Sequence, residues 1–282
     1  MPFSSRVVRP RAVILASLVA ALSLVFAGAA HASTLPTVSI AISPSAATVT
    51  GALESGGVNI VTTDTGVKEA AAIVFLLKPG VTVAEAETFI KEKKVKGDPN
   101  NTHNLGSIVF DTEANPGVPN EAQTTLVPGH YLLLVGAGEG EAALRTNFVV
   151  TAAKAPVTLP APEATIRTIE FGFRGPKTLH DGELVGFENE GFLVHMDVAA
   201  PVRSMTAAKR LIKDLLAGKE RAAGKLISGP PATFAGPLSN GAYQQETITA
   251  KPGIYVQLCF METQDGRSHT LLGMERIIKI TK

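Results

Sequence analysis

Three residues with metal-binding side chains follow one another near the C-terminal end of this 282-residue chain. A run of strand-forming residues ends at Cys259, and the loop after it carries His269 and then Met274. Thiolate, imidazole and thioether together form a soft-to-borderline ligand set that suits copper. A fourth ligand must come from elsewhere, and His195 is the candidate donor because a second strand-like segment carries it.

Each of these side chains also has a purely structural interpretation. Cys259 is the only cysteine, so it cannot form an intramolecular disulfide, and a buried free thiol can pack as a small hydrophobic residue. His195 lies in an apolar run and Met274 suits a β-sandwich core, whereas a solvated side chain is the ordinary expectation for His269. The metal hypothesis therefore depends on whether the four residues meet at one point.

The elements that must position these residues are predicted to be mostly short strands. The chain has 26 glycines, 18 prolines and no tryptophan, and 18% of its residues are charged, a composition that suits β-structure with many turns. A capping-box sequence from Thr82 to Glu85 predicts a helix that continues to about Lys94. Alternating apolar residues predict the early strands over 37–43, 47–53, 57–63 and 70–77.

The second half of the chain repeats the first at a spacing of about 124 residues. The run Pro128-Gly-His-Tyr131 aligns with Pro252-Gly-Ile-Tyr255, and a strand followed by a helix recurs, here over 205–216. A stretch with three prolines at 152–164 reads as a linker between the copies. We therefore expect a mainly β protein of two tandem β-sandwich domains, 33–151 and 165–282, each with an inserted α-helix.

The first copy lacks the residues that suggest a metal site in the second. Val135 occupies the position of Cys259, and Ala71 or a neighbour occupies the position of His195. No histidine or methionine follows Val135 in the rest of the first copy. If these residues only filled a core, nothing would lead them to be missing together, so the comparison favours the metal interpretation.

Three patterns mark the second copy: Asn189-Glu-Gly-Phe-Leu-Val-His195, Gly253-Ile-Tyr-Val-Gln-Leu-Cys259 and His269-Thr-Leu-Leu-Gly-Met274. With these patterns the second copy, from about Thr165 to Lys282, resembles the cupredoxins, a family of small copper-binding β-sandwiches. The first copy looks like a ligand-free version of the same Greek-key fold. The resemblance implies one copper ion, with Met274 as the long axial ligand and an activity of one-electron transfer or copper handling. The partner would be a redox or copper-exchange protein, and no organic substrate would be turned over.

Two features depart from the family pattern. Nine residues separate Cys259 from His269, a longer loop than in most cupredoxins. The Asp265-Gly266 turn predicts a hairpin that either returns His269 to the site or leaves the site loose. Met196 stands where the family usually has a polar residue that braces the ligand loop, and the loss of that hydrogen bond would weaken preorganisation.

The N-terminus has the pattern of a cleaved signal peptide. Three arginines precede an apolar stretch that begins at Ala12, and Ala30-His-Ala32 has the small-x-small form of a cleavage site. We expect cleavage after residue 32 and export to the periplasm or the medium. The alternative is a retained membrane anchor, because residues 12–30 carry no charge.

Charge and motifs narrow the remaining classes of function. Removing residues 1–32 takes away three arginines and no acid, which changes the formal net charge from +1 to −2 and argues against nucleic-acid binding. No later apolar run reaches membrane-spanning length. Hydrolase, phosphate-loop and paired-cysteine motifs are missing from the sequence, so we expect no enzyme. The alternative function is a metal-free exported β-sandwich that binds a ligand or a partner protein.

Overall fold

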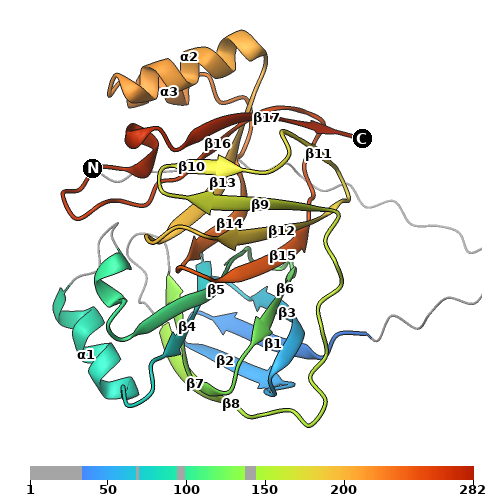
Figure 1. The fold of residues 1–282 in the computed structure, drawn as a ribbon, viewed down its shortest axis with the longest axis vertical. Coiled ribbons are helices and arrows are strands. Elements are labelled where there is room, and N and C mark those ends of the chain that lie inside the picture. The colour runs from blue at the N-terminus through green and yellow to red at the C-terminus, as the bar shows by residue number, and fades with distance from the viewer. Residues whose placement is uncertain (1–33, 68–69, 94–98, 137–143) are drawn as a thin grey trace, which may run out of the picture. The chain divides into compact units, whose positions relative to one another are not determined.

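The computed structural model describes residues 34–67, 70–93, 99–136 and 144–282, and residues 35–282 form one compact unit (Figure 1). The predicted signal peptide, 1–32, lies outside the described residues. Within the described part of the chain, no helix is long and apolar enough to cross a membrane.

The first half is a sandwich of two layers of strands. In one layer β1 runs parallel to β3, with β2 and β6 antiparallel on either side. The other layer is a four-stranded antiparallel sheet in the order β5-β4-β7-β8. The strands are β1 (Thr37–Ser43), β2 (Ala46–Gly51), β3 (Gly56–Asp64), β4 (Ala70–Leu77), β5 (Gly106–Ala114), β6 (Asn120–Leu126), β7 (Gly129–Gly136) and β8 (Leu144–Val150).

The second half has the same two-layer construction. One layer has the order β10-β9-β12-β15, and the other has the order β11-β17-β16-β13-β14. The strands are β9 (Ala164–Ile169), β10 (Gly172–Arg174), β11 (Thr178–His180), β12 (Leu184–Asn189), β13 (His195–Val202), β14 (Ala232–Leu238), β15 (Tyr243–Thr247), β16 (Gly253–Leu258) and β17 (Glu275–Thr281).

The topology confirms the predicted repeat. In each half a parallel strand pair, β1 with β3 and β9 with β12, is flanked by antiparallel neighbours, and β5-β4-β7-β8 corresponds to β14-β13-β16-β17. The aligned tyrosines also act alike: the Tyr131 hydroxyl donates to the Val127 carbonyl at 2.8 Å and the Tyr255 hydroxyl to the Lys251 carbonyl at 2.7 Å. The mainly β fold of two tandem sandwiches with inserted helices is therefore confirmed.

The two halves share one continuous sheet, which the repeat alone did not predict. Strands β6 and β15 pair antiparallel through Thr124 with Gln244 and Gln123 with Gln245. The layer that contains β6 and the layer that contains β15 therefore form a single eight-stranded sheet. The side chain of Gln245 strengthens this seam by donating to Gln123 Oε1 at 2.7 Å. Residues 152–163, in the predicted linker, contain no helix or strand. The domain bounds 33–151 and 165–282 stay a prediction.

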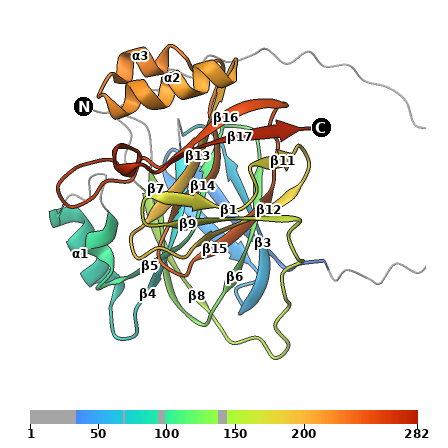
Figure 2. The same cartoon turned by 45° about the horizontal axis from the view of Figure 1, so that its top comes forward.

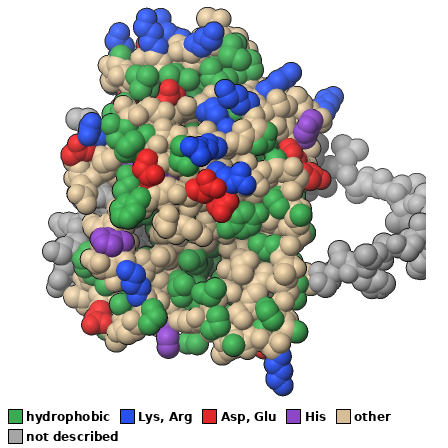
Figure 3. Space-filling model, viewed as in Figure 1, with side chains coloured by type: hydrophobic (Ala, Val, Ile, Leu, Met, Phe, Trp, Pro, Cys, Tyr) green, Lys and Arg blue, Asp and Glu red, His purple; other side chains and the backbone are tan. Residues whose placement is uncertain are grey.

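The inserted helices occupy equivalent places in the two halves. Helix α1 (Val83–Lys93) connects β4 to β5 through the 3-10 turn η1 (Pro99–Thr102), and the predicted capping box forms between Thr82 and Glu85. Helices α2 (Met205–Leu216) and α3 (Glu220–Gly224) connect β13 to β14 and lie beside β16 (Figure 2). The exposed faces of α2 and α3 are rich in lysine and arginine, which gather over these helices in Figure 3.

Candidate metal centre

Two neighbouring strands of the second sandwich bring His195 and Cys259 to the same end of their sheet. Strand β13 begins at His195, and Cys259 directly follows the last residue of β16. The strands are antiparallel, with Val198 opposite Leu258, so the start of one lies beside the end of the other. Adjacent antiparallel strands lie about 5 Å apart, which allows the two side chains to meet.

A short hairpin returns the chain to this position and delivers His269. Glu262 pairs with Ser268, and the Gly266 backbone takes the left-handed conformation, φ 77°, that the predicted Asp-Gly turn requires. The His269 N–H then donates to the Met261 carbonyl at 2.8 Å. The longer loop is therefore compatible with a closed site, since its extra residues form the hairpin.

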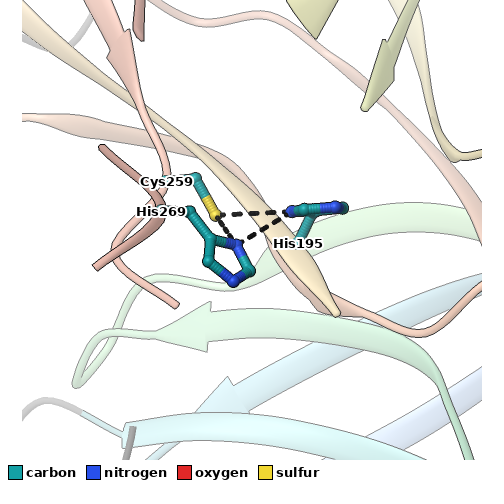
Figure 4. Close-up of side chains that lie close together, drawn as sticks. All are labelled: His195, Cys259 and His269. Atoms are coloured by element: carbon teal, nitrogen blue, oxygen red, sulfur yellow. Dashed lines mark hydrogen bonds between the residues drawn. The ribbon is translucent and has the colours of Figure 1, made fainter. Parts of the chain in front are cut away.

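The three side chains converge through specific atoms (Figure 4). The Nδ1 atoms of His195 and His269 lie 3.1 Å apart. The Cys259 Sγ lies 3.9 Å from His195 Nδ1 and 3.5 Å from His269 Nδ1. Both imidazoles thus turn the same ring nitrogen towards the sulfur.

These distances fit the requirements of a single bound ion. With bonds of about 2.0–2.1 Å to imidazole nitrogen and about 2.3 Å to thiolate, tetrahedral to trigonal angles place the two nitrogens about 3.3–3.6 Å apart. The same geometry places the sulfur about 3.5–3.8 Å from each nitrogen. Each measured separation lies within about 0.2 Å of these ranges, so one ion could bind with only small movements of the side chains.

The cluster is buried, and burial sets its protonation. His195, Cys259 and His269 expose 1%, 0% and 0% of their surfaces. Burial raises the pKa of the Cys259 thiol to about 12, against the opposing effect of N–H groups from Met196 and Met261. Burial and the neighbouring His269 lower the pKa of His195 to about 4, with Glu170 acting in the opposite direction. Without metal, the resting cluster is therefore a neutral thiol and a neutral His195, and a metal that binds the sulfur must displace the thiol proton.

Backbone groups hold the cysteine and its loop in place. The Met196 N–H donates to Cys259 Sγ at 3.4 Å, although the Met196 side chain is apolar. Thr270 bonds to both sides of the Cys259 peptide, because its hydroxyl accepts from the Cys259 N–H and donates to the Cys259 carbonyl. Hydrogen bonds to a thiolate stabilise its charged form, so the Met196 N–H favours the state that binds metal.

Asn189 braces the loop that leads to His195. Its amide donates to the carbonyls of Leu193 and Leu238, both at 2.7 Å, while its carbonyl oxygen accepts from the Gly191 N–H at 2.8 Å. A buried asparagine with these bonds fixes the loop at both ends. In the sequence Asn189 is only part of a pattern, and the structure shows what its side chain does.

Glu170 and Phe171, which were not predicted from the sequence, contact the cluster from the turn between β9 and β10. Glu170 Oε1 accepts from the Phe192 and Leu193 N–H groups and lies 4.0 Å from His195 Nε2. The Phe171 ring packs edge-on against the His269 ring, with centroids 5.3 Å apart. No motif marks these residues, because they lie in a turn that is 24 or more residues away in sequence from either histidine of the cluster.

The first half of the chain closes another side of the site. The Asn100 side-chain oxygen accepts from the Val194 N–H at 2.7 Å, one residue before His195. Val194 and Met261, which flank two of the ligands, join a hydrophobic cluster made mostly of first-half residues such as Phe75 and Leu132. The copy without ligands therefore helps to position the copy that has them.

Met274 is buried beside the cluster. Its N–H donates to the His269 carbonyl at 3.0 Å, and Gly273 makes the turn before it with φ 98°. Its assignment as the axial ligand stays a prediction. Of the other methionines, Met261 belongs to the hydrophobic cluster around Val194, and Met205 is half-exposed at the start of α2.

No protein-family model and no curated protein matches this sequence. Similar solved structures include reduced auracyanin from Roseiflexus castenholzii, at 18% identity over 42% of this chain and 95% of that one, with a TM-score of 0.26. The copper nitrite reductases from Thermus scotoductus and Nitrosomonas europaea each match 87% of this chain, covering 68% and 93% of their own, at 14% and 11% identity with TM-scores of 0.25 and 0.23. The strand order and the His-Cys-His convergence described above are what make the second half a cupredoxin-like sandwich, as its sequence predicted.

Proposed function

We propose that this protein is an exported copper-binding protein of the cupredoxin type. One copper ion would be held in the second half by His195, Cys259 and His269, with Met274 as a weak axial ligand. Its work would be one-electron transfer or copper handling with a protein partner, without turnover of an organic substrate.

One observation carries the proposal: two imidazole Nδ1 atoms and one thiol sulfur meet at distances that suit a single ion. Two imidazoles with one thiolate and a long thioether contact are the donor set of blue-copper sites. His195 opens β13, Cys259 directly follows β16, and His269 opens the 3-10 turn η2 (His269–Leu272). The two strands pair with each other, and η2 is tied to the chain after β16 by backbone hydrogen bonds. Such a site is preorganised, because folding has already brought its ligands together.

The residues of the chain supply binding, orientation and exclusion of water. Cys259 gives up its proton to become a thiolate ligand, and the Met196 N–H stabilises the resulting charge. Asn189 and Asn100 hold the backbone on either side of the His195 loop. Copper bound there would supply a one-electron redox couple, whose potential depends on the axial ligand and on the hydrogen bonds at sulfur.

The test is to load the purified, metal-free protein with Cu(II) and record its visible spectrum and its copper content. We expect one copper per chain and an intense thiolate-to-copper charge-transfer band, which Cys259→Ser abolishes. A double substitution of two exposed histidines, His130→Gln with His180→Gln, is the control and should leave both readings unchanged.

The alternative, a metal-free interaction or ligand-binding protein, predicts a different result. Wild-type protein would then take up no stoichiometric copper, and Cys259→Ala and His269→Ala would change neither its stability nor its binding of a partner. A colourless protein that loses its copper in the double histidine variant would also contradict the proposal, since the metal would be bound at the surface.

A further inference from the structure

We infer that Glu170 is a positioning residue that orients His195 for metal binding and favours a divalent over a monovalent ion at this site. The inference rests on the proposed metal site and assigns a role to a residue outside the ligand set. It depends on how Glu170 is held, on what faces the outer nitrogen of His195, and on the charge of the carboxylate.

The Glu170 carboxylate is fixed in place although part of it is exposed. Its Oε1 accepts hydrogen bonds from two successive backbone N–H groups, those of Phe192 and Leu193, in the loop that leads to His195. Partial burial acts to raise the pKa of Glu170, but the hydrogen bonds from the Leu193 and Phe192 N–H groups act against it, and the pKa is lowered overall. The carboxylate is therefore an anchored group, unlike a mobile surface side chain.

The outer nitrogen of His195 faces this carboxylate. Because Nδ1 points towards Cys259, the ring proton of a metal-bound His195 must lie on Nε2. Among the described residues this buried Nε2 has no hydrogen-bond partner, and Glu170 Oε1 lies 4.0 Å away. A movement of roughly 1 Å would bring the two atoms within hydrogen-bond distance. Ligating histidines almost always donate their other N–H to such an acceptor, which fixes the tautomer and the ring orientation.

Gly191 makes this approach possible. A Cβ at this position would lie 2.8 Å from His195 Nε2 and 2.9 Å from Glu170 Oε1, directly beside both atoms. Phe171, the next residue after Glu170, has the unusual backbone φ of 53° and contacts the second histidine, His269. A non-glycine residue rarely adopts this conformation without support from its surroundings. One turn of the chain therefore reaches both imidazoles of the cluster.

The negative charge gives the site a preference between oxidation states. The attraction between a carboxylate and an ion scales with the charge of the ion, so Glu170 stabilises Cu(II) about twice as much as Cu(I) at the same distance. The carboxylate therefore contributes more to Cu(II) binding than to Cu(I) binding. A residue that only supported the fold would affect both ions alike.

The test compares Glu170→Gln with Glu190→Gln in the full chain. Both substitutions remove one carboxylate charge near the His195 loop, but Glu190 is exposed and paired with Arg167 at 3.1 Å. Affinities for Cu(II) and for Cu(I) would be measured separately by competition with chromophoric chelators, and thermal unfolding of the metal-free proteins would verify folding. We expect Glu170→Gln to weaken Cu(II) binding about 10-fold or more and Cu(I) binding clearly less, while Glu190→Gln changes neither.

Three outcomes would overturn the inference. Equal affinities in the two glutamine variants would show that Glu170 has no special role. An equal loss for both ions would show a structural role only. A wild-type protein that binds neither ion would overturn the proposed function as well, which distinguishes that failure from the first two. Glu170→Ala, which also removes the acceptor for Phe192 and Leu193, should reduce the affinity for both ions more than the glutamine variant does.

Discussion

Replacing Gly191 with alanine tests whether the outer side of His195 is as tightly packed as the structure indicates. The added Cβ would stand 2.8 Å from His195 Nε2 and 3.0 Å from His195 Cδ2, whereas ordinary van der Waals contacts begin at 3.4 Å. The backbone of Gly191 cannot easily yield, since its N–H bonds to Asn189 Oδ1 and its carbonyl accepts from the Asn240 amide. The imidazole must therefore move by roughly half an ångström or more, given the packing density of protein interiors.

Two effects that can be measured separately follow from this displacement. Overpacking a buried position costs about 1–3 kcal/mol of unfolding free energy. Moving the ring also takes His195 Nδ1 out of the position that suits a shared ion and Nε2 out of line with Glu170, which should reduce the affinity for copper about 10- to 100-fold. Urea unfolding of the metal-free protein measures the first effect, and copper competition titration measures the second.

The matched control is Gly224→Ala, at the end of α3. Its Cβ would meet nothing within 4 Å, so this substitution should be neutral or slightly stabilising and should leave copper binding unchanged. The reasoning is refuted if Gly191→Ala retains wild-type affinity and stability, or if the control loses as much as the variant.

Two further predictions concern the contact between the halves and Glu246, a partly buried acid on β15. Asn100→Ala should lower the unfolding free energy by about 1 kcal/mol and weaken copper binding, because the Val194 N–H loses its acceptor. Substitution of the exposed neighbour, Asn101→Ala, should do neither. Urea unfolding and copper titration of both variants test this prediction. Burial, and then the charges of Asp197 and Glu113, raise the pKa of Glu246 to about 8. The unfolded carboxyl ionises near pH 4.5, so the stability that its neutral form provides is present below that pH and is lost as the pH rises towards 8. Glu246→Gln should therefore be more stable relative to wild type at pH 8 than at pH 5, and an unchanged difference between urea unfolding at the two pH values would contradict this.

The local features of the fold were predictable from sequence because neighbouring residues encode them. The alternation of apolar side chains placed β1 and β4 at the bounds that the structure shows, and the capping box from Thr82 to Glu85 marked the start of α1. Three of the four candidate ligands lie within sixteen positions of the sequence, Cys259 to Met274, so their proximity follows largely from the chain itself. The repeat, in turn, singled out the half that carries them.

Tertiary structure alone decided what surrounds the ligands. Asn100 and Glu170 reach the His195 loop from 94 and 22 residues away, measured to Val194 and Phe192, and neither belongs to a recognisable motif. The pairing of β6 with β15 depends on which strands are left at the sheet edges, a property that exists only after both sandwiches have formed. Periodicity and turn residues determine the elements, because those signals act over a few residues. The packing and hydrogen bonds around the cluster join distant parts of the chain, so they are set by strand register and sheet pairing.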